Sequence, residues 1–389
     1  KKFFVTSNLL PHNDKVRTYL RDIEPVIAMK PDALIMADPG LMAMIRERWP
    51  DMPIHLSVQA NTVNSAAVRF WKSAGVSRVI LSRELSLDQV AQIRQECPDT
   101  ELEVFVHGAL CIAYSGRCLL SGYFNHRDAN QGSCTNSCRW DYKTQPGVVD
   151  ASGDILAPQA AAERERGQEH AEVYVIEESQ RPGSYMPIEE DEHGTYVMNS
   201  KDLRAIEHVK RLVEIGVDSL KIEGRTKSPY YVARTAQTYR QAIDDAVAGR
   251  ELDPALLGQL EGLANRGYTS GFFQRHTPES TQNYLRGYSE SGRSLYVGDV
   301  VAFDELRGLA QVNVRNRFAV NDRLEIIHPR GNHDIRIAHM ENAEAQPVAI
   351  APGSGHTVWL PLPATMVGAF IARYVAESEL RSSAVPASA

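Results

Sequence analysis

Hydrophobic residues in the first two thirds of the chain form short runs that end in polar residues and alternate with helix-like stretches. We predict strands at the runs Phe3–Asn8, Ala33–Asp38, Ile54–Gln59, Arg78–Ser82, Glu103–His107 and Ser219–Glu223. The helical patterns between them are Leu41–Arg48, Ala66–Ala74, Leu87–Glu96 and Asp202–Ile215. Apolar strands separated by helices predict a parallel α/β architecture in which helices cover the sheet.

The number of these units favours a particular fold. A (β/α)8 barrel of the TIM type has eight units, and because this chain opens inside a strand, we expect the first two units to lie before Lys1. An open doubly wound sheet is the alternative, although no glycine-rich phosphate turn follows the first strand. In both folds, ligands bind at the carboxyl ends of the strands.

The apolar period changes to two near Ser294. The alternating segments are Val297–Phe303, Leu309–Val314, Arg323–Ile327, Ile335–His339 and His356–Leu360. Bounded by Gly, Pro, Asn and Asp, they predict a small antiparallel β-barrel. The predicted domains are a β/α barrel over 1–250, with a cysteine loop at 107–143 and an insertion at 144–200, a linker at 251–293, the β-barrel at 294–376 and a disordered tail at 377–389.

Composition narrows the class of protein. No apolar run approaches the length of a membrane-spanning helix, so we expect no membrane contact. The net charge of −7 excludes nucleic-acid binding by the whole surface, because phosphates are neutralised by Lys and Arg, and any RNA must bind a local basic patch. The sparing use of cysteine fits a reducing, cytoplasmic compartment.

Four of the five cysteines lie within one segment, at Cys111, Cys118, Cys134 and Cys138. Disulfides explain this poorly, because the rest of the long chain is nearly free of cysteine. Four thiolates can instead hold structural zinc or an iron–sulfur cluster. Zinc ribbons use tight C-x2–4-C pairs, and only Cys134 and Cys138 approach that spacing, so the spacing alone leaves both metals open.

Polar residues recur where the predicted strands end. Asn8, Gln59, Arg83 and His107 each follow an apolar run, and recurrence at one edge predicts a shared pocket beside the cysteine loop. His107 is also compatible with a role in the core.

The segment Leu220–Ser228 places Lys221, Arg225 and Lys227 before a predicted helix, Tyr230–Ala248, which suggests an anion site. A surface ion-pair cluster in which Glu223 neutralises Lys221 or Arg225 is the alternative. The helix itself interleaves tyrosines with arginines, which suits an RNA surface as well as ordinary packing at helical spacing.

The motifs HGALCIAYSGRCLLSGY, from residue 107, and SCTNSCRWDY, from residue 133, resemble the signature of peptidase family U32. The resemblance extends over nearly the whole chain, through PDALIMADPG, MPIHLSVQAN, RVILSRELSL, SLKIEGRTKS and HTVWLPLP. It implies a [4Fe–4S] cluster on Cys111, Cys118, Cys134 and Cys138. It further implies an enzyme that hydroxylates the wobble uridine of tRNA to 5-hydroxyuridine with prephenate as co-substrate.

With this resemblance, the candidate residues receive roles. We assign catalysis to His107 and Glu223, and substrate binding to Asn8, Gln59, Arg83, Lys221, Arg225 and Lys227. The expected partners are the tRNA anticodon loop, a small dicarboxylate and an electron-donor protein.

Other functions stay open. Peptidase activity has no support from the usual motifs, since the chain has neither H-E-x-x-H nor G-x-S-x-G. Cys111 or Cys118 with His107 as base would remain, but a thiolate that binds a cluster is not free to attack a peptide. Hydroxylation of ribosomal RNA or a quinone precursor, and RNA binding with a purely structural cluster, are the further alternatives.

Overall fold

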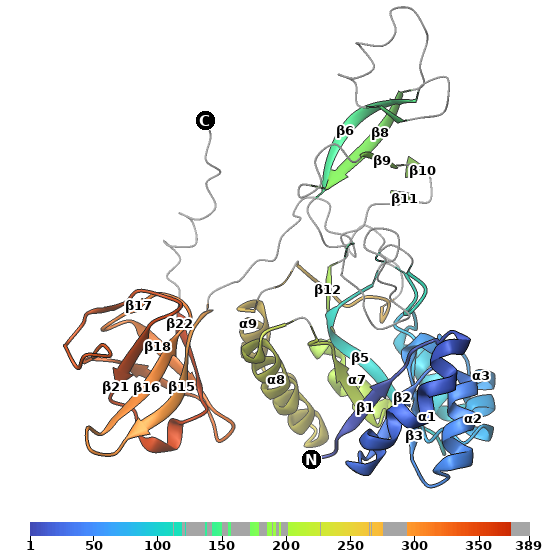
Figure 1. The fold of residues 1–389 in the computed structure, drawn as a ribbon, viewed down its shortest axis with the longest axis horizontal. Helices are drawn as coiled ribbons and strands as arrows, with labels where there is room; N and C mark the ends of the chain where they lie inside the picture. The colour runs from blue at the N-terminus through green and yellow to red at the C-terminus, as the bar shows by residue number, and fades with distance from the viewer. Residues whose placement is uncertain are drawn as a thin grey trace, which may run out of the picture. The chain divides into compact units, whose positions relative to one another are not determined.

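The computed structural model describes residues 1–111, 113–118, 121, 137, 201–225, 227–263, 265, 267–274 and 294–374, and short strands between 142 and 195. It divides into two compact units (Figure 1). The first contains 1–204, 215–221 and 266–288, and the second contains 205–214, 222–265 and 289–389. No helix in the described ranges has both the length and the apolar character that crossing a bilayer requires.

The first unit is built on an eight-stranded mixed sheet. Its strands are β1 (Phe4–Ser7), β2 (Ala33–Met36), β3 (Ile54–Leu56), β4 (Arg78–Ile80), β5 (Glu101–Ala109), β12 (Asp202–Arg204), β13 (Ser219–Ile222) and β14 (Tyr268–Thr269). Strands β1 to β5 pair in chain order and in parallel, and β13 also pairs with β5. The predicted α/β class and the six predicted strands are confirmed.

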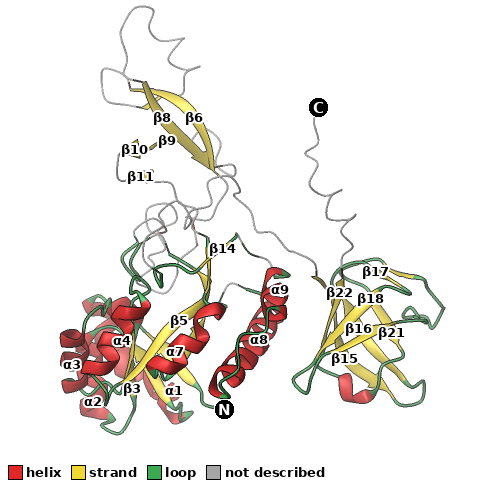
Figure 2. Cartoon of the chain, turned by 180° about the vertical axis from the view of Figure 1, so that it is seen from behind, coloured by secondary structure: helices red, strands yellow, loops and turns green. Residues whose placement is uncertain are grey.

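Helices connect these parallel strands. They are α1 (Asn13–Ala28), α2 (Pro39–Arg48), α3 (Ser65–Ser73) and α4 (Leu87–Glu96), and they lie together beside the sheet (Figure 2). Local sequence sets where they begin: the Asp38 side chain accepts from Leu41 N–H at 2.8 Å, and Ser86 and Gln89 form a capping box. Strand β2 is buried at every position, as expected for a central strand covered on both faces.

One predicted helix begins later than its sequence pattern indicates. Asn199–Asp202 resembles a helix cap leading into a helix over Asp202–Ile215, but Asp202–Arg204 is strand β12, antiparallel to the end of β5. Helical structure begins only afterwards, with a 3-10 turn at Ile206–His208 and α7 at Val209–Ile215. Pairing with β5 satisfies the backbone of this segment, and this long-range contact overrides the local capping pattern.

The insertion contains more strand than we predicted. A four-stranded sheet has the order β7-β6-β8-β9, and its strands are β6 (Tyr142–Val149), β7 (Ile155–Leu156), β8 (Glu172–Glu178) and β9 (Tyr185–Ile188). A short antiparallel pair, β10 (Glu190–Asp191) and β11 (Gly194–Thr195), follows. From the sequence we predict two strands here, at 173–176 and 195–198. The first is confirmed within β8, and residues 196–198 of the second lie outside the described residues.

The second unit combines helices α8 (Pro229–Val247) and α9 (Ala255–Glu261) with the C-terminal strands. The strands are β15 (Ser294–Asp304), β16 (Leu309–Val314), β17 (Phe318–Ala319), β18 (Arg323–Ile327), β19 (His333–Arg336), β20 (Ile350–Ala351), β21 (Thr357–Leu360) and β22 (Phe370–Tyr374). Six of them form an antiparallel sheet in the order β19-β18-β22-β15-β16-β21 over a core that includes Val297, Phe318 and Ile371. The predicted tail at 377–389 lies outside the described residues.

Candidate functional site at the carboxyl edge of the sheet

The predicted polar residues of β1 and β3 meet at the carboxyl edge of the parallel sheet. Asn8 Nδ2 donates to Ser57 Oγ at 3.3 Å, and Ser57 Oγ also accepts from Gln59 N–H at 3.3 Å. Asn8 and Gln59 are thus brought to one place by parallel pairing, although the two strands lie far apart in sequence.

The start of the cysteine loop docks on this edge. Asn61, in a left-handed conformation with φ of 52°, donates through Nδ2 to the carbonyl oxygen of Gln59 at 2.8 Å and of Ser115 at 3.3 Å. Gly116 has φ of +76°, and a Cβ there would lie 3.0 Å from Gln59 Cγ, so the backbone packs directly on the Gln59 side chain. Ser115 and Gly116 therefore pack on the turn that follows β3.

Arg83, just beyond β4, joins the next strand to the same loop. Its guanidinium carbon lies 3.8 Å from the ring centroid of Phe105, which is 6% exposed in β5. Nη1 donates to the carbonyl oxygen of Ala109 at 3.0 Å and lies 3.7 Å from Cys111 Sγ. Arg83 thus contacts both the last residue of β5 and the first cysteine of the loop.

The described thiols suit a metal centre. Cys111 is exposed, Cys118 is half-buried, and both are free of disulfides. They lie in a docked loop at a strand end with an Arg N–H directed at one sulfur, an arrangement that fits cluster-binding thiolates. Cys134 and Cys138 lie outside the described residues, and within the described part no three potential metal ligands gather.

His107 lies deep in the sheet. It is 1% exposed, and its ring centroid is 5.4 Å from that of Tyr268 in β14. Arg204, paired in register with His107, places its guanidinium carbon 5.1 Å from the Tyr268 ring. Arg204 and Tyr268 were not among the predicted site residues, because only the pairing of β5 with β12, and of β12 with β14, brings them to His107.

Lys221 is engaged in a buried ionic cluster. Its Nζ lies 3.0 Å from Glu103 Oε1, and Arg78 Nη1 lies 3.1 Å from Glu103 Oε2. Burial disfavours the Glu103 carboxylate, but Lys221, Ser219 and Arg78 outweigh it and lower the pKa of Glu103. Burial and the Arg78 charge lower the pKa of the neighbouring His55 to about 4. This geometry matches a structural ion-pair role for Lys221, with Glu103 as its partner.

Glu223, Arg225 and Lys227 belong to the loop before α8 in the second unit. Glu223 Oε1 accepts from Arg225 N–H at 3.0 Å, and Lys227 Nζ lies 4.7 Å from the ring centroid of Tyr231. The exposed Arg225 guanidinium has no partner among the residues that the structure describes. A Cβ at Gly224 would lie 2.7 Å from Val232 Cγ2, so a larger residue there would require the Val232 side chain to move.

The tyrosines of α8 that we considered for an RNA surface are buried. Tyr230, Tyr231, Arg234 and Tyr239 are between 2% and 5% exposed. The Arg234 guanidinium forms a bidentate ion pair with the Glu325 carboxylate of β18, with both N–O distances at 2.9 Å. These residues are the interior of the second unit, so helical spacing here reflects packing.

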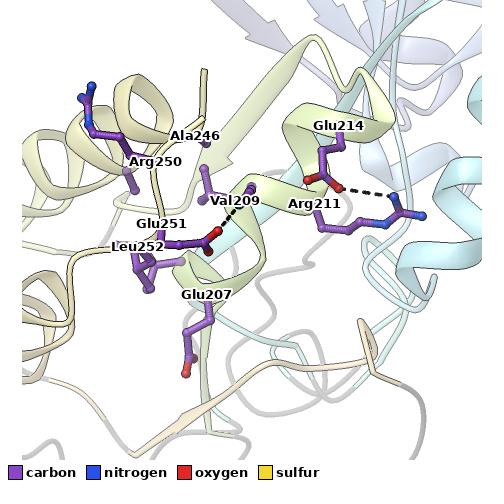
Figure 3. Close-up of a pocket in the computed structure, with 11 residues that line it drawn as sticks. Glu207, Val209, Arg211, Glu214, Ala246, Arg250, Glu251 and Leu252 are labelled. Atoms are coloured by element: carbon purple, nitrogen blue, oxygen red, sulfur yellow. Dashed lines mark hydrogen bonds and ion pairs between the residues drawn. The ribbon is translucent and has the colours of Figure 1, made fainter. Parts of the chain in front are cut away.

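A separate cavity of about 350 Å³ lies in the second unit between α7 and the end of α8 (Figure 3). Its charged lining residues are Glu207, Lys210, Arg211, Glu214, Arg250 and Glu251. Lys210 pairs with Glu251, and Arg211 lies 3.5 Å from Glu214. Because opposite charges balance, the cavity has no preference for an anion, and none of the predicted site residues lines it.

The fold and the site define an α/β protein with a cysteine loop at the carboxyl edge of a parallel sheet. Residues 1–283 match the model of peptidase family U32, and residues 293–373 match the peptidase family U32 C-terminal domain. The chain belongs to peptidase family U32.

Named relatives make the comparison more specific. The chain is 58% identical to the tRNA hydroxylation protein P of Escherichia coli (strain K12), covering 93% of this chain and 82% of the relative. It is 54% identical to the protein of the same name from Haemophilus influenzae, over 93% of this chain and 81% of that protein. It is 29% identical to the 23S rRNA 5-hydroxycytidine C2501 synthase of Escherichia coli, over 78% of this chain but 38% of that protein.

Proposed function

We propose that this protein is a tRNA-modifying hydroxylase that converts the wobble uridine to 5-hydroxyuridine with prephenate as co-substrate. The observation that supports it most is the 58% identity to a tRNA hydroxylation protein across 82% of that protein. The position of the cysteine loop at the carboxyl edge of the sheet agrees with it, since α/β folds do their chemistry there.

In this proposal, Cys111, Cys118, Cys134 and Cys138 hold a [4Fe–4S] cluster, which supplies one-electron redox chemistry when bound. The protein holds the described part of the loop from two sides, through Gln59 and Asn61 on one and Arg83 on the other. Four protein ligands would saturate the cluster, so substrates are held by the polypeptide. An electron-donor protein is the corresponding partner.

We assign the dicarboxylate of the co-substrate to Arg225 and Lys227. The exposed guanidinium of Arg225 is available for a bidentate contact, and the loop leads into a long helix whose N–H groups add to the positive potential. Lys221 and Arg83 have partners within the protein. Any contact they make to substrate is additional to those bonds.

The nucleobase needs a site at the carboxyl edge. A uridine in an anticodon loop is already unstacked, so it can enter without opening a duplex. Asn8 and Gln59 present amide groups there that suit the edge of a pyrimidine, while His107 and Glu223 remain the candidates for proton transfer. Cytoplasmic location follows from a tRNA substrate.

The first experiment is tRNA modification by protein purified without oxygen. We expect 5-hydroxyuridine in nucleoside mass spectra only when prephenate is present, and about four irons and four sulfides per chain. A Cys111→Ala/Cys118→Ala variant should lose the iron, the sulfide and the formation of 5-hydroxyuridine. Zinc without sulfide, or modification independent of prephenate, would contradict the proposal.

Variants test the anion site separately. Arg225→Ala should raise the prephenate concentration needed for half-maximal modification at least tenfold, since it removes a charge-assisted contact. Arg240→Ala is the matched control, because Arg240 lies on α8 paired with Asp244 at 2.5 Å. Equal behaviour of the two variants would remove Arg225 from the site.

One alternative has a specific observation behind it. The similarity to an rRNA 5-hydroxycytidine synthase favours a test of ribosomal RNA in the same assay. Hydroxylated cytidine in 23S rRNA, with tRNA unchanged, would favour that substrate.

We also propose the finer architecture. The parallel pairing of β1 to β5, with β13 also paired to β5, suits a (β/α)8 barrel over 1–250. The C-terminal sheet suits a small β-barrel over 294–376, with 251–293 as the connection.

A further inference from the structure

The Arg83 side chain is held by a ring and by the backbone at the end of β5. Its guanidinium stacks on Phe105 at 3.8 Å, and Phe105 is a buried residue of β5. Stacking on a fixed ring restricts the plane in which the five N–H groups of the guanidinium lie. The position of Phe105 in β5 therefore sets the direction of the Arg83 N–H groups.

One donor group, Nη1, is directed at the point where the chain leaves β5. It is 3.0 Å from the carbonyl oxygen of Ala109 and 3.7 Å from Cys111 Sγ. The first contact fixes the backbone two residues before the cysteine. The second is an N–H to sulfur contact of the kind that tunes metal–thiolate centres.

The opposite side of the loop is fixed as well. Asn61 holds the Ser115 carbonyl oxygen, and Gln59 packs on Gly116. These contacts hold the backbone four and five residues after Cys111, and the bond from Arg83 to Ala109 holds it two residues before. Within the described part of the segment, Cys111 is thus held beside Arg83 from both directions along the chain.

We propose that Arg83 is a positioning residue that donates a hydrogen bond to the Cys111 thiolate and raises the reduction potential of the cluster. This inference rests on the proposed function, because it requires Cys111 to be a cluster ligand. One-electron reduction makes the cluster more negative by one charge. A neighbouring cation and an N–H to sulfur bond stabilise the reduced form more than the oxidised form.

Potentiometric titration of the purified holoprotein, followed by electron paramagnetic resonance and visible absorption, tests this role. Arg83→Gln should shift the midpoint potential to a more negative value, while iron and sulfide content stay at the wild-type level. Arg83→Lys should shift it in the same direction but less, because an ammonium keeps the charge and loses the planar fork. Arg69→Gln is the control of equal charge change, since Arg69 pairs with Glu96 on the surface of α3 and α4.

The outcomes distinguish a failure of the proposed function from a failure of the role of Arg83. Wild-type protein without labile sulfide would overturn the proposed function. A loaded Arg83→Gln protein with the wild-type potential, or a more positive one, would overturn only the role of Arg83. If Arg83→Gln fails to retain the cluster, the midpoint potential of Arg83→Lys is compared with that of the wild type. An unchanged potential in Arg83→Lys then overturns the inference.

Discussion

Two regions of the sheet in the first unit use charged residues in opposite ways. Around Glu103 in β5, Arg78 and Lys221 both bind the buried carboxylate, so charge is neutralised inside the protein. At the carboxyl edge, Arg83 meets a ring, a carbonyl oxygen and a thiol. The ion pairs of Glu103 stabilise the fold, whereas the contact between Arg83 and the Cys111 thiol suits a metal-binding site.

Register explains the first of these regions. His55, Arg78 and Glu101 are neighbours across three parallel strands, so they lie in one row. In a parallel sheet, in-register residues point to the same face, which concentrates these side chains in one place. The ring of Phe4 covers the row, 4.7 Å from His55 and 5.4 Å from the Arg78 guanidinium carbon.

The largest effect should come from Glu103→Gln. Removing a buried charge that serves two cations takes this carboxylate from Lys221 and leaves Arg78 with Glu101 alone, and we expect a loss of about 3–5 kcal/mol in the free energy of unfolding. Glu101→Gln is the matched control, because the Glu101 side chain is 50% exposed and its pair with Arg78 should contribute about 1 kcal/mol or less. Urea unfolding of both proteins measures the difference. Similar losses would show that the buried pairs of Glu103 with Arg78 and Lys221 are not the stabilising element.

His55 should make this region sensitive to pH. Its pKa in the folded protein is about 4, whereas the pKa of a histidine in an unfolded chain is about 6.5. Between these values the unfolded chain binds a proton that the folded protein does not, so stability falls as the pH falls through this window. His55→Phe should make the free energy of unfolding less dependent on pH from 6.5 to 4. An unaltered slope would contradict the assignment.

The smallest effect should arise at the carboxyl edge, from Gly116→Ala. A side chain at φ of +76° and 3.0 Å from Gln59 Cγ should destabilise the loop by about 1–2 kcal/mol and speed iron loss to a chelator. Gly249→Ala is the control, with φ of +73° and nothing within 4 Å of the added Cβ. It should carry the backbone cost and leave iron release unchanged. Equal iron release would show that the Gln59 contact does not hold the loop.

Much of the secondary structure was predictable because it depends on local physics. The buried strands carry continuous apolar runs, and Asp38 and Ser86 mark helix starts by bonding backbone N–H groups nearby. The prediction failed at Asp202–Arg204, where the pattern for a helix start was sound but β5 offered a partner far away in sequence. Local patterns carry no information about such partners.

The candidate site divides in the same way. The sequence by itself determined that four cysteines follow a strand, that polar residues end the strands, and that the chain has the motifs of its family. Only the tertiary structure decided which cations are available: Lys221 meets Glu103, and Arg83 meets Phe105 and Cys111, while Arg225 stays exposed. The reason is physical. Residue type fixes what a side chain can bind, but burial and the partners supplied by distant strands fix what it does bind.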